Sequence, residues 1–330
     1  MRTPLETIWR QHIGVSEASW DIIKAAWSQS TISSYGTVAK KWLQYTSDNG
    51  VSVIYPTVPQ VVDFLVDINK KGGGHSTVAT SRSFLSCFIH AEGRPIGEHP
   101  MLSKLVKRVK VINQPEEKNS YIWDPTTVID TMAAWGPISD LTLEQLTKRT
   151  LMLFLLATGQ RIQGAFQLLR KDMVIMDNSI RIKYSTKMKS NDPAKNPLTL
   201  RFDKLEEERV CVFTHLTSYL NREDTAGAHP RTFGTVKTPV TPASSVTLSR
   251  LIRQTLTDTG IEEHFRPYSV RSASTSAADR LNVPMDKILT SAGWARTSTF
   301  ARFYKRPLLQ EQEDTSTETN FITYFVRETP

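Results

Sequence analysis

The chain has 330 residues, a formal net charge of +8 at pH 7, 39% hydrophobic residues and 22% charged residues. This length allows two domains with separate cores, and the positive charge favours a polyanionic partner, because Lys and Arg displace counterions from phosphates. No apolar run reaches the roughly 20 residues of a membrane-spanning helix. We therefore expect no membrane partner. We also expect no secretory signal, and no disulfide framework from the two distant cysteines.

Residues 1–114 are predicted to form a helical domain. Hydrophobic periodicity predicts helices over 31–50, 57–74, 74–93 and 101–112. Gly50 is a helix-ending residue, and Thr57 with Gln60 forms a capping box. The polar stretch NQPEEKNS follows, and we place an interdomain linker at 115–120 within it.

Residues 121–310 are predicted to form a second domain, with a tail at 311–330. Thr142 and Gln145 are a capping box at the start of a strongly apolar helix. Alternating residues then predict strands over 179–186 and 196–202. Helices are expected over 204–221, 244–259, 272–281, 285–292 and 297–305. The predicted fold class is therefore mainly α with a small antiparallel β-sheet.

Several kinds of chemistry have no support in the sequence. It contains no HExxH or CxxC metal motif, no GxxxxGK[ST] phosphate loop and no GxSxG nucleophile elbow. The sequence therefore predicts an enzyme without metal, cofactor or ATP, if the chain acts on phosphates at all.

Four segments carry the remaining candidate residues. They are ATGQRIQGAFQLLRKDM (157–173), STKMKS (185–190), FRPYSVRSASTSAADRL (265–281) and SAGWARTSTFARFYKRP (291–307). Taken singly, each has an ordinary structural explanation. Arg161 would form a core ion pair, Lys187 would lie in a solvated hairpin, and Trp294 and Tyr304 would be core aromatics.

Taken together, the order of these residues resembles the tyrosine recombinase family from about residue 18 to 310. The ending GW…STFARFY and the run RSASTSAA are most similar to recombinases of DIRS-like retroelements or crypton-type transposons. The resemblance implies a helical core-binding domain followed by an α+β catalytic domain. It also implies site-specific cutting and rejoining of DNA through a 3′-phosphotyrosine, in the integration of a mobile element.

The resemblance assigns a role to each candidate. Arg161 and Arg271 would bind the scissile phosphate, and Lys187 in the hairpin would be the general acid. Trp294 would contact a non-bridging oxygen, and Tyr304 would be the nucleophile. Tyr268 stands where the family usually has His, and Gly164 stands where it usually has an acidic residue. A phenol donates hydrogen bonds but is a poor base near neutral pH, so these departures affect the expected rate and pH profile.

Double-stranded DNA is the expected partner, and we expect no small-molecule substrate. The expected assembly is a homo-oligomer on DNA, with a dimer on each site and a tetramer in the complex. The two domains would close around the duplex as a clamp, and the apolar residues 321–326 would dock on a neighbouring protomer. Candidate DNA contacts are Lys70, Lys71, Arg82, Lys104, Lys107, Arg108, Lys110 and Lys189.

Two other functions remain open. One is a type IB topoisomerase-like enzyme, which shares the chemistry but relaxes supercoils as a monomer. The other is a DNA-binding protein that has lost its catalytic activity, with 272–281 and 285–292 as a helix-turn-helix. The expected location is the nucleus if the source is eukaryotic, and otherwise the cytoplasm.

Overall fold

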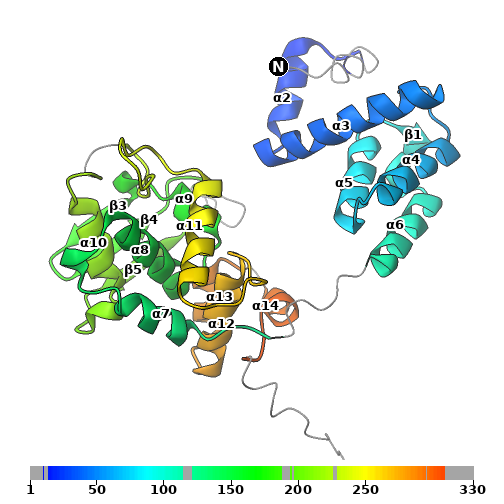
Figure 1. Cartoon of the computed structure of the whole chain (residues 1–330). Coiled ribbons are helices and arrows are strands. Elements are labelled where there is room, and N and C mark those ends of the chain that lie inside the picture. Colours follow the sequence, from blue (N-terminus) through cyan, green and yellow to red (C-terminus); the bar gives the residue numbers. More distant parts are fainter. Residues whose placement is uncertain are drawn as a thin grey trace, which may run out of the picture. The chain divides into compact units, whose positions relative to one another are not determined.

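The computed structural model describes residues 10, 14–113, 121–187, 194, 197–225, 229–294 and 296–308. The chain forms two compact units, Met1–Glu116 and Glu117–Pro330, whose elements are labelled in Figure 1. The expected fold class is confirmed, because helices dominate and the sheets are small and antiparallel. Within the described part of the chain, no helix has both the length and the apolar character needed to cross a bilayer.

The N-terminal unit is built from helices. They are α2 (Glu17–Ala25), α3 (Gln29–Asn49), α4 (Val58–Lys70), α5 (His75–Ser86) and α6 (Pro100–Ile112). The side chains of Trp42, Phe64 and Leu85 are almost fully buried between them. Burying each such side chain stabilises the fold by about 1.5–3 kcal/mol, which is why these short helices persist.

Local signals in this unit formed as predicted. Gly50 ends α3 in the left-handed region, with φ 61°. Thr57 and Gln60 exchange both capping-box hydrogen bonds at the start of α4. A short hairpin of β1 (His90–Ala91) and β2 (Arg94–Pro95) was not predicted, because two-residue strands show no periodicity.

The C-terminal unit is arranged around α8 (Leu143–Thr158), which contacts α10, α11 and α12. Figure 1 shows α8 within this unit, beside α11. The other helices are α7 (Pro125–Ala133), α9 (Ile162–Gln167), α10 (Val212–Asn221), α11 (Ser245–Asp258), α12 (Ser269–Arg280), α13 (Met285–Ala292) and α14 (Thr297–Phe303). Because α8 is covered on several sides, its second half (151–157) is continuously apolar, and even Lys148 and Arg149 of its first half are buried.

A three-stranded antiparallel sheet has the order β3-β4-β5. Its strands are β3 (Met173–Met176), β4 (Ser179–Lys183) and β5 (Thr199–Asp203), with Ile182 opposite Leu200. Ile180 and Ile182 are buried whereas Arg181 and Lys183 are exposed, so β4 shows the predicted alternation. The prediction of two strands missed β3, whose last three residues are all exposed and carry no alternating pattern.

Two predicted helix boundaries of this unit were wrong, and in the N-terminal unit the helix expected over 74–93 ends at Ser86. The helix expected over 204–221 begins only at Val212, because the Cys211 sulfur accepts hydrogen bonds from the amides of Leu205 and Thr214 and turns the chain there. The helix expected from 272 begins at Ser269. Arg271 therefore lies in the first turn of α12.

Candidate active site

Arg271 is the buried centre of the candidate site, with 3% of its surface exposed. Its Nη1 donates hydrogen bonds to the carbonyl oxygens of Gly159, at 2.7 Å, and Ala292, at 2.8 Å. Gly159 ends α8 and Ala292 ends α13. One guanidinium nitrogen thereby joins α12 to the ends of two other helices.

Two aromatic rings cover the guanidinium of Arg271. Its Cζ lies 4.0 Å from the ring centroid of Trp294 and 5.1 Å from that of Tyr304. The two rings are 4.6 Å apart between centroids. Among the described residues, Arg271 Nε and Nη2 and Trp294 Nε1 have no hydrogen-bond partner. The site therefore holds buried donors that a bound anion could satisfy.

Arg161 adds a second positive charge to this site. It is the N-cap residue of α9 and is exposed. The pKa of Arg271 is lowered to about 10, chiefly by burial and then by the positive charge of Arg161, whereas Tyr304 acts in the opposite direction. An anion placed between the two guanidinium groups would relieve this repulsion.

A cavity of about 240 Å³ brings four of the predicted residues together. Arg161, Tyr268, Arg271 and Tyr304 all line it, and Trp294 lies against Arg271. No carboxylate is among its lining residues. Two arginines without a carboxylate suit a phosphate better than they suit a metal or a neutral ligand.

Gly159 fixes the turn that leads into Arg161. Its φ is +60°, and a Cβ at this position would come within 2.8 Å of the Thr275 side chain. Only glycine combines the left-handed conformation with this close approach to α12. Gly293 has φ +68° at the end of α13 and similarly precedes Trp294.

Tyr268 and Tyr304 differ in their accessibility. Tyr268 is the N-cap residue of α12, and 61% of its surface is exposed. Tyr304 directly follows α14 and is half-buried. Both phenols line the cavity, so a phosphate bound to the arginines would have a hydroxyl from each of two elements near it.

The structure describes only one of the two predicted hairpin lysines, Lys187. Lys187 follows β4, is exposed and is not among the residues that line the cavity. Lys189 lies outside the described residues, as does the tail 311–330. The expected general acid is therefore the one predicted catalytic side chain that does not join the other five.

The candidate DNA contacts of the N-terminal unit fall into two groups. Arg82 Nε donates to the Gly97 carbonyl at 2.6 Å, and Lys71 pairs with Asp67 at 2.8 Å. These two side chains already have partners within the fold. The remaining basic residues are exposed at the end of α4 and along α6: Lys70, Lys104, Lys107, Arg108 and Lys110.

Sequence reasoning missed Gln160 and Gln163, which also line the cavity. The Gln160 amide donates to the Ser291 carbonyl. A Cβ on Gly164 would lie 3.2 Å from the Gln160 side chain, so Gln160 occupies the space beside the position where the family usually has an acid. Both glutamines flank Arg161 in ATGQRIQG, and that adjacency was the available signal.

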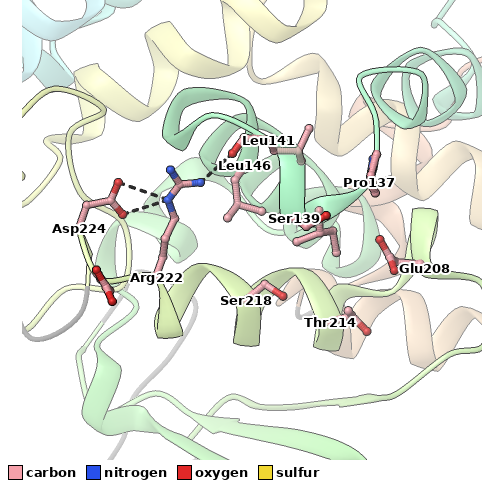
Figure 2. Close-up of a pocket in the computed structure, with 11 residues that line it drawn as sticks. Pro137, Ser139, Leu141, Leu146, Glu208, Thr214, Ser218, Arg222 and Asp224 are labelled. Carbon is pink, nitrogen blue, oxygen red and sulfur yellow. Dashed lines mark hydrogen bonds and ion pairs between the residues drawn. The ribbon is translucent and has the colours of Figure 1, made fainter.

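A larger hollow of about 730 Å³ lies between α10 and the start of α8 and shares no lining residue with this cavity. Figure 2 shows Arg222 of this hollow bonded to Asp224 and to the Leu141 carbonyl, at 3.0 Å and 2.7 Å. Its arginine is thus neutralised, and Glu208 and Glu223 add negative charge. This hollow is unsuited to a phosphate. No group of His, Cys, Asp and Glu within the described segments is placed to hold a metal ion.

The chain is similar to known proteins in sequence and in fold. The phage integrase family matches residues 137–311. No curated protein matches. Several solved structures resemble the chain over most of its length. A lambda integrase dimer bound to a COC′ core site has 14% identity and a TM-score of 0.53, covering 87% of this chain and 93% of that chain.

Two further structures extend this likeness. XerH site-specific recombinase, in a post-cleavage complex with a palindromic difH substrate, has 14% identity and a TM-score of 0.59, covering 87% of this chain and 79% of that chain. The Tn1549 transposon integrase, in complex with circular intermediate DNA, has 12% identity and a TM-score of 0.58, covering 94% of this chain and 97% of that chain. At this identity the likeness shows a shared fold. With the family match over more than half of the sequence, it establishes that this chain belongs to the phage integrase family of tyrosine recombinases.

Proposed function

We propose that this chain is a site-specific DNA recombinase that cuts and rejoins strands through a 3′-phosphotyrosine intermediate. The observation that carries the proposal is the carboxylate-free cavity lined by Arg161, Arg271 and Tyr304. A phosphodiester bound there would have two cationic forks on its oxygens and a phenol beside it. Family membership and the DNA complexes of lambda integrase, XerH and Tn1549 integrase support the same substrate.

The proposed reaction is an exchange of one phosphate ester for another. The Tyr304 oxygen attacks the phosphorus and gives its proton to water, while the bond from phosphorus to the 5′ oxygen breaks and that oxygen takes up a proton. Arg161 and Arg271 stabilise the charge that develops on the non-bridging oxygens, where losing one donor costs about 3–4 kcal/mol. Attack by a 5′-hydroxyl reverses the step, so strand exchange needs neither ATP nor a metal.

Trp294 and Tyr268 would assist in different ways. The Trp294 indole covers Arg271, and its buried Nε1 is available to a non-bridging oxygen. Tyr268 would donate a hydrogen bond to the phosphate from the start of α12, where backbone N–H groups also favour anions. Neither residue needs to move a proton in this scheme.

A nicked duplex that traps the intermediate tests the proposal. The chain is incubated with the duplex and the mixture is run on a denaturing gel. We expect a covalent protein–DNA adduct that disappears in Tyr304→Phe. Binding without an adduct would instead indicate a DNA-binding protein that has lost its activity.

Lys187 is proposed to protonate the leaving 5′ oxygen. A substrate with sulfur in place of that oxygen needs no proton, because a thiolate is a good leaving group. Lys187→Ala should therefore cleave the normal substrate about 10²–10³-fold more slowly but cleave the sulfur substrate at nearly the unmodified rate. Arg161→Ala should cleave both the normal and the sulfur substrate slowly. If Lys187→Ala is equally slow on the two substrates, Lys187 is not the general acid.

We propose that the chain acts as a homo-oligomer on DNA, with a dimer on each site and a tetramer in the complex. Residues 321–326 of the tail are proposed to dock on a neighbouring protomer. Deleting 311–330 and measuring assembly on a two-site substrate by size-exclusion chromatography tests this. Unchanged assembly would exclude the tail as the connecting element.

The proposed setting is integration of a mobile element, in the nucleus if the host is eukaryotic and otherwise in the cytoplasm. Support comes from the resemblance of RSASTSAA and GW…STFARFY to such recombinases. A supercoil-relaxation assay separates recombination from topoisomerase activity, because a topoisomerase relaxes plasmids that lack paired sites. Imaging of a fluorescent fusion tests the location.

A further inference from the structure

Side chains of α12 hold the backbone that carries Tyr304. The Ser276 hydroxyl donates a hydrogen bond to the Tyr304 carbonyl at 2.7 Å and accepts one from the Arg306 amide at 3.1 Å. Ser276 is 2% exposed, so water does not compete for these bonds. One hydroxyl thus fixes the chain on both sides of residue 305.

Two serines of α12, Ser274 and Ser276, use their hydroxyls outside their own helix: Ser274 donates to the Leu156 carbonyl, and Ser276 bonds the backbone of Tyr304 and Arg306. Thr275 on the same helix donates to the Arg271 carbonyl, and Thr158 and Thr255 likewise donate to carbonyls four residues earlier. Such bonds only satisfy the hydroxyl within its own helix. The Ser276 hydroxyl instead leaves its helix and reaches residues 28 and 30 positions away.

Tyr304 lies just past α14, which holds its amide through a hydrogen bond to the Phe300 carbonyl at 2.8 Å but leaves its own carbonyl to other partners. The helix ends at Phe303, and Tyr304 has φ −128° and ψ −25°, outside the helical range. Two nearby contacts assist weakly. Lys305 pairs with Asp279 at 3.0 Å, but 62% of the Lys305 side chain is exposed, and such surface pairs add little. Arg280 donates to the Arg306 carbonyl at 3.4 Å.

Ser276 also lies on the helix that carries Arg271. The Tyr304 ring lies 5.1 Å from the Arg271 guanidinium carbon. A tie from α12 to residue 304 therefore fixes the phenol relative to the group that would bind the phosphate. Displacing a reacting group by about 1 Å can slow a reaction about 10²-fold.

We propose that Ser276 is a positioning residue for Tyr304. It acts through the backbone of residues 304–306, without touching the reacting atoms, and it keeps the phenol in line with a phosphate held by Arg271. This inference rests on the proposed function, in which Tyr304 is the nucleophile.

The test compares Ser276→Ala, Ser276→Thr and Ser249→Ala in the full chain. Ser249 is a matched control, since its hydroxyl only bonds the Ser245 carbonyl of its own helix. The rate of adduct formation is measured at saturating nicked duplex. The Kd for DNA is measured with each change in a Tyr304→Phe background, where no cleavage occurs.

We expect Ser276→Ala to slow adduct formation about 10–100-fold while its Kd stays within about twofold. Ser276→Thr keeps the hydroxyl and should retain most of the rate, and Ser249→Ala should match the unmodified chain. A normal rate in Ser276→Ala, a Kd that weakens as much as the rate, or a Thr variant as slow as the Ala variant would overturn the inference. An unmodified chain that forms no adduct would overturn the proposed function itself.

Discussion

Arg271 has a structural and a chemical task in the same side chain. Its Nη1 holds the carbonyls of Gly159 and Ala292, while Nε and Nη2 have no partner among the described residues. A lysine has one nitrogen and cannot hold both carbonyls and also present two donors to a phosphate. This division of one guanidinium explains why an arginine is needed here.

Arg271→Lys should therefore lower the rate of adduct formation at saturating DNA by about 10²–10³-fold. The matched control is Arg253→Lys, at an exposed position of α11, which should leave the rate unchanged. A lysine variant with more than about a tenth of the normal rate would show that the guanidinium fork is not required.

His215 makes stability depend on pH. It is fully buried, its Nδ1 lies 3.0 Å from the Cys211 carbonyl, and burial lowers its pKa to about 4. Between about pH 6.5 and pH 4 the unfolded chain binds a proton that the folded chain does not bind. The free energy of unfolding should therefore fall with decreasing pH in this window, by about 3 kcal/mol.

Urea denaturation of the full chain at several pH values measures this effect. His215→Leu cannot bind a proton and should lose this part of the pH dependence. His90→Leu, at an exposed strand position, should retain it. Identical pH profiles for His215→Leu and the unmodified chain would contradict the assignment.

At the scale of elements, the end of α8 positions Arg271, which donates a hydrogen bond to the Gly159 carbonyl. An alanine in the left-handed conformation costs roughly 1–2 kcal/mol, and at position 159 its Cβ would also meet Thr275 at 2.8 Å. Gly159→Ala should therefore destabilise the C-terminal unit by more than that amount. Gly260→Ala is the control, since Gly260 has φ +77° but open space around its Cβ position. Thermal unfolding and adduct formation should both be more impaired in Gly159→Ala, and equal effects would contradict this account.

Elements that depend on local hydrogen bonds could be predicted from the sequence. The capping boxes Thr57–Gln60 and Thr142–Gln145 both form, because the required partners stand three residues apart. Strand β3 and the start of α10 depend on distant contacts instead. β3 pairs along β4 although its last three residues are exposed, and Cys211 turns the chain before α10.

At the scale of the whole molecule, the order of residues in the sequence indicated the chemistry but not its arrangement. Three of the four candidate segments meet at one cavity, because α8, α12 and α13 pack so that Arg271 reaches the ends of the other two helices. Neither the Gln160 contact to Ser291 nor the Ser276 contact to Tyr304 follows from sequence spacing, because each joins residues of separate helical segments.

Binding by the N-terminal unit should show in the salt dependence of DNA affinity. Lys104, Lys107, Arg108 and Lys110 are exposed on α6, and within the described residues none of them forms an ion pair. Each lost phosphate contact reduces the slope of log K against log salt by about 0.9. Replacing all four by Gln should reduce it by about 3 to 4.

Lys71→Gln is the control variant. Lys71 already pairs with Asp67, so its replacement should change the slope less than the replacement of an unpaired lysine of α6. Kd values from fluorescence anisotropy at several NaCl concentrations give these slopes. An unchanged slope in the fourfold variant would show that α6 does not face the DNA backbone.

The central claim is that the phenol of residue 304 attacks a phosphate held by two arginines of the same unit. The most direct measurement is mass spectrometry of the protein–DNA adduct after digestion with a protease and a nuclease. The account predicts that a 3′-phosphonucleotide is attached to Tyr304 and to no other residue. Attachment at Tyr268 or any other side chain, with residue 304 unmodified, would contradict it.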